Sequence, residues 1–136
     1  MTPRESARDV VERYLAALNR HDVDAAVDCV AVDFVNEHTS ALGTTVRGRD
    51  AYRERLPQFL ARFDDLRYDA EDFIVDADRV AVPYTMTCTV RGDDGAHPVR
   101  LRGMFRFRVE RGVITHRVDY WDGTEFERQL NTERHS

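Results

Sequence analysis

The sequence contains no lysine and only two cysteines, and it has no long run of apolar residues. A membrane-spanning helix needs about 18 or more consecutive apolar residues, and the first residues, Met1 to Glu5, lack the apolar stretch of a signal peptide. Cys29 and Cys88 lie far apart and without metal-ligand spacing, so we expect two reduced thiols. These absences predict a cytoplasmic protein with no membrane partner.

Arginine supplies all 20 basic side chains, against 25 acidic residues, and the formal net charge is -5. A net negative chain is repelled by the phosphate backbone, so nucleic acid is not an expected partner. The exclusive use of arginine is typical of a GC-rich coding bias and indicates a bacterial source.

Motifs for metals and nucleotide cofactors are also missing. The histidines His21, His97, His116 and His135 are irregularly spaced and have no cysteine partners, so no metal site is predicted. The sequence contains no phosphate-binding loop, no GxSxG elbow and no dinucleotide fingerprint. We therefore expect a protein without a cofactor.

A chain of 136 residues, 42% of them hydrophobic, is predicted to form a single domain over 1–136. Thr2, Pro3 and Glu5 resemble a capping box at the start of a first helix. Apolar residues then recur with the 3.6-residue period of a helix at Ala7, Val10, Val11, Tyr14, Leu15 and Leu18.

Two further helices are predicted before the chain changes its period. Asp22 can cap a short helix whose apolar stripe runs from Val23 to Val30. A third helix is expected over 49–63, and Pro57 should kink it or divide it into two pieces. Its core face is predicted to consist of Tyr52, Leu56, Phe59, Leu60 and Phe63.

Strands are predicted over 33–38 and then near 66–75, 79–91, 97–110 and 113–121, with turn residues between the last four. The segment 97–110 alternates apolar residues with arginines, which is the pattern of a sheet with one buried face. The fold class is therefore α+β. We expect three N-terminal helices packed on a strongly curved, mostly antiparallel sheet that forms a cone-shaped pocket.

Three stretches of the sequence carry a family resemblance: Glu12 to Asn19 with Asp22 to Val27, Val46 to Ala51, and Gly112 to Phe126. They resemble the nuclear transport factor 2-like superfamily, in particular the SnoaL-like polyketide cyclases, the ketosteroid isomerases and limonene epoxide hydrolase. The resemblance covers nearly the whole chain. It implies a pocket for an apolar small molecule, and the superfamily contains both enzymes and non-catalytic binding proteins.

The resemblance also implies roles for single residues. Tyr14 occupies the place of the isomerase phenol, His38 that of the isomerase base, and Gly103 that of its protonated acid. Asp119 matches the last aspartate of the Asp-Arg-Asp set of the epoxide hydrolases, whose other two positions fall at Met86 and Tyr84. In the SnoaL-like cyclases the acid/base carboxylate also lies on the last strand, so the resemblance implies Asp119.

Strand alternation places Arg117, Asp119 and Trp121 on one face of the last strand and Val118 and Tyr120 on the other. Alternation alone does not show which face is inward, and the resemblance selects that of Asp119. Burial in an apolar pocket would raise the pKa of Asp119, unless Arg117 pairs with it. A purely structural Arg117–Asp119 pair is the alternative.

His38 can donate a hydrogen bond to an enolate or relay a proton; otherwise it is a histidine at the end of a strand. We predict Asp119, His38 and Tyr14 as catalytic residues, although core packing also explains Tyr14. The predicted substrate-binding residues, for each of which ordinary packing or capping is the alternative, are Phe34, Asn36, Tyr84, Met86, Leu101, Phe105, Arg117 and Trp121.

Two functional hypotheses follow. The first is a cofactor-independent enzyme of cyclase or isomerase type, in which Asp119 takes a proton next to a carbonyl and His38 or a water holds the enolate. The second is a non-catalytic binding module with the same pocket, and epoxide hydrolysis is a weaker third.

The Tyr120 side of the last strand also predicts a homodimer.

Overall fold

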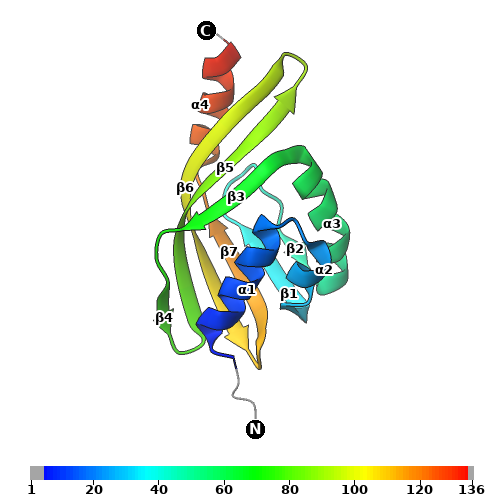
Figure 1. Ribbon diagram of the computed structural model, residues 1–136, viewed down its shortest axis with the longest axis vertical. Helices are drawn as coiled ribbons and strands as arrows, with labels where there is room; N and C mark the ends of the chain where they lie inside the picture. Colours follow the sequence, from blue (N-terminus) through cyan, green and yellow to red (C-terminus); the bar gives the residue numbers. More distant parts are fainter. Residues whose placement is uncertain (1–4, 135–136) are drawn as a thin grey trace.

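The computed structural model describes residues 5–134 of the chain, and Figure 1 shows the order and arrangement of its helices and strands. The elements are α1 (Ala7–Asn19), α2 (Val23–Val27), β1 (Val30–His38), β2 (Val46–Arg47), α3 (Arg49–Arg62), β3 (Phe63–Ala70), β4 (Ile74–Asp76), β5 (Arg79–Gly92), β6 (Gly95–Glu110), β7 (Val113–Tyr120) and α4 (Gly123–Arg134).

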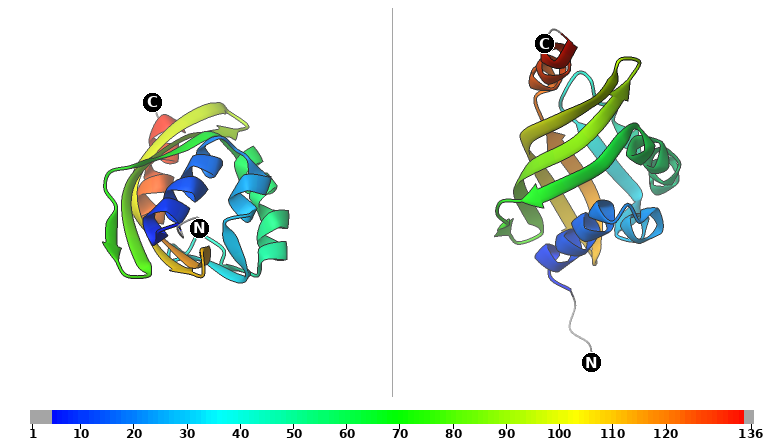
Figure 2. Two further views of the ribbon diagram at one scale, coloured as in Figure 1. Left: turned by 60° about the horizontal axis from the view of Figure 1, so that its bottom comes forward. Right: turned by 45° about the horizontal axis from the view of Figure 1, so that its top comes forward.

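The strands form one mixed sheet in the order β2-β1-β7-β6-β5-β3, and β4 pairs with the other end of β5. Neighbouring strands are antiparallel except β1 and β7, which run parallel. Helices α1, α2 and α3 pack on one face, and the sheet bends around α1 (Figure 2, left). The predicted α+β fold, with N-terminal helices on a mostly antiparallel sheet, is confirmed.

Helix α1 begins one residue after Ser6, whose side chain accepts a hydrogen bond from the backbone of Asp9. The carboxylate of Asp9 accepts one from the backbone of Ser6, which completes a capping box. The box that we predicted begins at Thr2 and Pro3, which lie outside the described residues. The capping box that the structure describes is formed by Ser6 and Asp9, where a hydroxyl and a carboxylate have the same spacing.

Helix α3 is one continuous element over Arg49–Arg62, so of the two predicted outcomes at Pro57, a kink or a division, the division does not occur. Proline removes the hydrogen bond to the carbonyl four residues earlier. Pro57 and Arg53 are both exposed, so water can bind the carbonyl that is freed. Tyr52 and Leu56 on the opposite side are buried and hold the helix against the sheet.

Other boundaries also differ from the predictions. Strand β1 begins at Val30, because Val30 pairs with Ile114 of β7, and α2 correspondingly ends at Val27. The predicted strand 66–75 is divided into β3 and β4, and the predicted loop before α3 contains β2. Helix α4 was not predicted; it is tied to β6 by Gln129, which bonds the backbone N–H and C=O of Arg100 at 2.9 and 2.7 Å.

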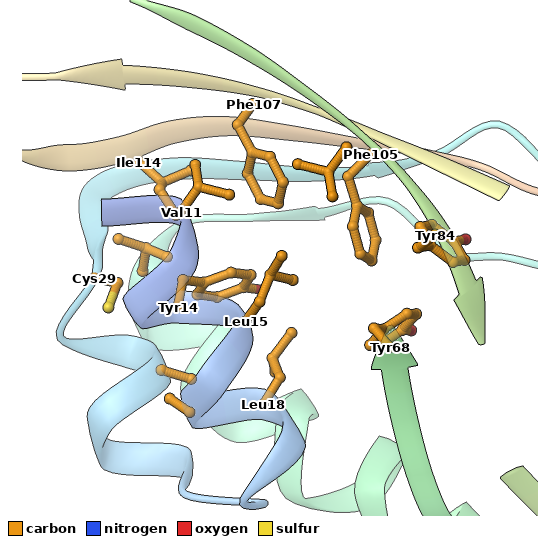
Figure 3. Packing of buried hydrophobic residues seen from close by; sticks show 14 of the residues in the cluster. Val11, Tyr14, Leu15, Leu18, Cys29, Tyr68, Tyr84, Phe105, Phe107 and Ile114 are labelled. Atoms are coloured by element: carbon orange, nitrogen blue, oxygen red, sulfur yellow. The ribbon is translucent and has the colours of Figure 1, made fainter. Parts of the chain in front are cut away.

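The core lies between α1 and the inner face of the sheet. Strand β6 shows the predicted alternation, with Phe105 and Phe107 fully buried and the arginines between them exposed. Tyr14, Leu15 and Leu18 of α1 face these rings (Figure 3), and the Tyr14 ring meets Phe107 edge-on at 5.9 Å between centroids. None of the helices in residues 5–134 is long and apolar enough to cross a membrane.

Candidate functional site

A cavity of about 560 Å³ lies where α3, α4, β1, β7 and the 42–46 loop meet. Its wall is largely apolar and includes Leu18, Leu56, Phe59, Phe63, Trp121, Phe126 and Leu130. A wider surface groove of about 670 Å³, lined by Ser40, Arg102 and Tyr120 among others, contains none of the buried polar side chains. The cavity of about 560 Å³ is therefore the candidate site.

Four polar side chains of the lining, Asn36, His38, Tyr52 and Arg117, form what we call the polar cluster. The lining also contains Thr44, Arg55, Gln58, Arg62, Tyr68 and Glu127. The parallel pairing of β1 with β7 sets Asn36 beside Arg117 and His38 beside Asp119. Residues about eighty positions apart in the sequence are thereby joined into one group.

Arg117 is a buried cation, with 4% of its surface exposed. Its Nε donates to Oδ1 of Asn36 at 2.7 Å and its Nη1 donates to the hydroxyl of Tyr14 at 3.2 Å. The guanidinium carbon lies 4.9 Å from the centroid of the Phe105 ring. Burial opposes this charge, but the oxygens of Tyr14 and Tyr52 and the carboxyl of Asp119 outweigh it and raise the pKa of Arg117.

No direct ion pair joins Arg117 to Asp119 among the described side chains, so the structural pair that we considered is not formed. Asp119 is 3% exposed, and its Oδ1 accepts a hydrogen bond from the hydroxyl of Tyr84 at 2.5 Å. Its Oδ2 lies 3.7 Å from Nδ1 of His38. Burial raises the pKa of Asp119, and the charge of Arg117 and the Tyr84 bond oppose this only in part.

His38 is neutral near pH 7, because burial first and the charge of Arg117 second lower its pKa from 6.5 to about 4. The indole Nε1 of Trp121 donates to Nδ1 of His38 at 3.3 Å. Since an indole can only donate, Nδ1 accepts and the ring proton of the neutral imidazole is on Nε2. Among the described residues Nε2 has no hydrogen-bond partner, and His38 lines the cavity.

Gly103 allows Tyr84 to reach Asp119. The two residues are paired across β5 and β6, and a Cβ at position 103 would overlap the hydroxyl end of Tyr84. Position 103 is where the resemblance places the protonated acid of the isomerases. In this protein the hydroxyl of Tyr84 takes up that space and bonds the carboxyl of Asp119 instead.

Tyr14 and Tyr52 form a buried pair whose hydroxyl oxygens are 2.5 Å apart. Tyr14 is fully buried and does not line the cavity, whereas Tyr52 does. The helical period predicted only that Tyr52 lies on the core face of its helix. Helical spacing shows which side of a helix is inward, but not which group its hydroxyl meets there.

The predicted site residues fall into three groups. Asn36, His38, Arg117 and Trp121 line the cavity. Phe34, Leu101 and Phe105 are buried in the core, Met86 is partly buried against it, and Tyr14, Tyr84 and Asp119 lie behind the cavity wall. Within residues 5–134 no three metal-binding side chains are placed to hold an ion.

Comparison with known proteins is consistent with this architecture. The SnoaL-like domain matches residues 11–117, so the chain belongs to the SnoaL-like family within the nuclear transport factor 2-like superfamily. The predicted resemblance is thereby confirmed. A search of curated proteins found no match.

Solved structures with this fold are numerous. A proposed SnoaL-like polyketide cyclase from Shewanella denitrificans is 16% identical with a TM-score of 0.84, over 93% of this chain and 97% of that one. An epoxide hydrolase of M. tuberculosis resembling limonene epoxide hydrolase is 22% identical (TM-score 0.78, 93% and 90% covered). TerC co-crystallised with polyporic acid is 20% identical (TM-score 0.79, 92% and 98% covered). At these identities the likeness is one of fold.

Proposed function

We propose that this protein is a cofactor-independent acid/base enzyme of polyketide cyclase or isomerase type, which removes a proton next to a carbonyl of an apolar metabolite. One observation carries the proposal: Asp119 and His38 lie 3.7 Å apart beside an apolar cavity, and their pKa values are shifted in opposite directions. A buried carboxyl with a raised pKa is a stronger base than an exposed one, and a neutral imidazole can donate a hydrogen bond.

The proposed reaction begins with transfer of a proton from the carbon next to the carbonyl to Oδ2 of Asp119. The electron pair of that C–H bond moves toward the carbonyl and forms an enolate, whose oxygen accepts a hydrogen bond from Nε2 of His38. In an isomerisation, Asp119 returns the proton to another carbon. In a cyclisation, the enolate carbon attacks a second carbonyl of the same molecule and the proton passes to the new alkoxide.

Asp119 lies behind the cavity wall, so we propose that one water molecule carries the proton between the substrate and Oδ2. Oδ1 is held by Tyr84 and stays in place during this transfer. His38 and Trp121 then have separate tasks: Trp121 sets the tautomer of the imidazole, and His38 presents its N–H to the enolate oxygen.

Deuterium exchange tests the proposal without knowledge of the natural substrate. We expect the protein to accelerate exchange at the carbon next to the carbonyl in a panel of aryl-substituted cyclic 1,3-diketones and enones in D₂O, followed by proton NMR. Asp119→Asn should slow exchange by about 100-fold or more, and His38→Gln by about 10-fold. Asp33→Asn, on the exposed side of β1, is the matched control and should exchange like the wild type. Exchange at an unchanged rate in Asp119→Asn would refute the role of Asp119.

A non-catalytic binding module is the second candidate. It is favoured by the position of Asp119, which is bonded to Tyr84 and does not line the cavity. In that case the diketones bind, Asp119→Asn changes their affinity only modestly, and no exchange is seen. Epoxide hydrolysis has less support. Asp119 matches the last aspartate of the Asp-Arg-Asp set, but Tyr84 and Met86 occupy the positions of its other aspartate and its arginine.

We also propose that the chain forms a homodimer through the outer face of β6 and β7. Met104 and Tyr120 are exposed there, with 37% and 40% of their surfaces accessible. Light scattering after gel filtration should give twice the mass of the chain at micromolar concentration, and a mass of one chain would rule the dimer out.

A further inference from the structure

The guanidinium of Arg117 has hydrogen-bonding capacity that the protein does not use. An arginine carries five N–H donors, and the bonds to Asn36 and Tyr14 account for two of them. Arg117 is buried, lines the cavity, and forms no ion pair with any described carboxylate. A buried charge without a direct counter-ion is costly, so this group is arranged for a partner that enters the cavity.

The hydrogen bonds around Arg117 have a definite direction. Nη1 of Arg117 donates to the Tyr14 oxygen, and Tyr14 is fully buried, so its own O–H needs an acceptor nearby. The oxygen of Tyr52 at 2.5 Å is the acceptor within reach. Tyr14 therefore donates to Tyr52, and the O–H of Tyr52 is left to donate into the cavity.

The same reasoning applies to Asn36. Its Oδ1 must face Nε of Arg117, because arginine cannot accept, and so the amide NH₂ of Asn36 is the group left for the cavity. With Nε2–H of His38, every member of the polar cluster presents a donor: Arg117, Asn36, Tyr52 and His38. These four donors lie on the buried polar side of the cavity and favour a ligand with acceptor or anionic oxygens.

The charges along the cavity wall agree with this selection. Arg55 and Arg62 of α3 also line the cavity, and Glu127 is the one acidic lining residue in the described part of the chain. The cavity is thus positive, although the whole chain carries a formal charge of -5. A cavity of opposite sign to the rest of the molecule attracts an anion into the site.

We infer that the ligand is an apolar organic anion, whose carboxylate or ionised enol or phenol group binds Arg117, Asn36 and Tyr52. This inference names the substrate class of the proposed function and rests on the same cavity. It does not depend on catalysis, because it concerns only which charge the cavity accepts. Tyr52, rather than Tyr14, is the tyrosine that contacts the ligand.

Two fluorescent probes with the same aromatic frame test the inference: 8-anilinonaphthalene-1-sulfonate, which is an anion, and N-phenyl-1-naphthylamine, which is neutral. We expect the wild type to bind the anion at least 10-fold more tightly. Arg117→Met should abolish that preference, and Tyr52→Phe should reduce it about 3-fold. Arg53→Gln is the matched control. Arg53 is on α3, like Tyr52, but it pairs with Asp24 outside the cavity. The variant should keep the full preference for the anionic probe.

Equal affinities of the wild type for the two probes would overturn the inference, as would a preference that persists in Arg117→Met. If Arg117→Met is unfolded by circular dichroism, Tyr52→Phe and the double variant Arg55→Gln/Arg62→Gln decide, and an unchanged preference in both is the contradicting result. Asp119→Asn separates this inference from the proposed function, because the variant should lose deuterium exchange and keep the preference for the anionic probe. A preserved anion preference without deuterium exchange in the wild type supports the ligand class and removes the enzyme, and exchange without preference does the reverse.

Discussion

The two faces of the sheet hold arginines in opposite states. On the outer face Arg102 and Arg108 of β6 are exposed and pair with Glu71 and Asp78 at 2.7 and 3.3 Å. On the inner face Arg117 of β7 is buried and bonds only to neutral groups. Water screens the exposed ion pairs, so they contribute little to stability. The charge of the buried arginine is screened much less and acts more strongly on its surroundings. The buried arginine of the candidate site is therefore the one that forms no direct ion pair with a described carboxylate.

Neighbouring strands also differ on the inner face itself. Strand β6 presents apolar residues there, and strand β7 presents Arg117 and Asp119. The first strand supplies stability through packed rings, and the second supplies the polar groups of the site. Phe105 connects the two functions, because its ring lies beneath the guanidinium of Arg117.

The largest expected effect compares two adjacent residues of β6. Phe105 is fully buried against the rings of Tyr68, Tyr84 and Phe107, whereas Met104 is exposed on the outer face. Phe105→Ala should lower the free energy of unfolding by about 3–5 kcal/mol, because it leaves a cavity. Met104→Ala should change it by less than about 0.5 kcal/mol. Urea denaturation measures both changes. Similar losses in the two variants would mean that the inner and outer faces of β6 contribute equally to stability.

The next effect concerns His38 and pH. Its pKa is about 4 in the folded protein and 6.5 as a free side chain, so between these values the unfolded chain binds more protons. Stability from neutral His38 is therefore fully present above pH 6.5 and is lost as the pH falls toward 4. The loss should reach about 3 kcal/mol.

The control for this prediction is His38→Gln, which should lack that fall in stability. Asp119, whose pKa is raised, contributes in the opposite direction: its penalty for being ionised is relieved as the pH falls. Both proteins share this contribution, so the difference between their unfolding free energies isolates His38. Parallel pH curves would contradict the assignment.

A smaller effect is expected from the hydrogen bond behind the cavity. Tyr84→Phe removes the bond to Asp119 and should cost about 2 kcal/mol. It should also raise the pKa of Asp119 further, since that bond lowers it. Carboxyl ¹³C NMR and urea denaturation measure the two changes. Tyr68→Phe is the matched control, because the Tyr68 hydroxyl bonds none of the described residues; an equal effect there would show that the bond is unimportant.

The smallest effect belongs to the outer face. Arg102→Gln breaks an exposed pair with Glu71 and should leave the urea midpoint unchanged within error, at low and at high salt. A clear, salt-dependent loss would mean that the outer pairs stabilise the sheet. The contrast between Arg102 and Arg117 would then be weaker than we propose.

Much of the fold was predictable, because its signals are local. The 3.6-residue period of α1 and the alternation of β6 place Tyr14 and Phe105 inward without knowledge of their partners. Helix α4 was missed because its sequence is largely polar and its position depends on the bonds of Gln129 to β6. The capping box at Ser6 and Asp9 was also missed, because Thr2 and Ser6 offer similar hydroxyls at the same spacing from a carboxylate.

The candidate site was predictable only in part. Alternation on the last strand placed Arg117, Asp119 and Trp121 together but left open whether Arg117 pairs with Asp119. The tertiary structure decided this through the side chains that surround each group: Asn36 and Tyr14 bond Arg117, and Tyr84 bonds Asp119. Those partners come from three other elements, α1, β1 and β5, and no spacing in the sequence encodes their meeting.

The sequence by itself determined the inward faces of the helices and strands, the α+β class and the SnoaL-like resemblance, since each follows from patterns a few residues long. Only the tertiary structure set β1 parallel to β7 and so joined His38 to Asp119 and Asn36 to Arg117. It also set the pKa shifts, because they depend on burial and on charges contributed by distant segments.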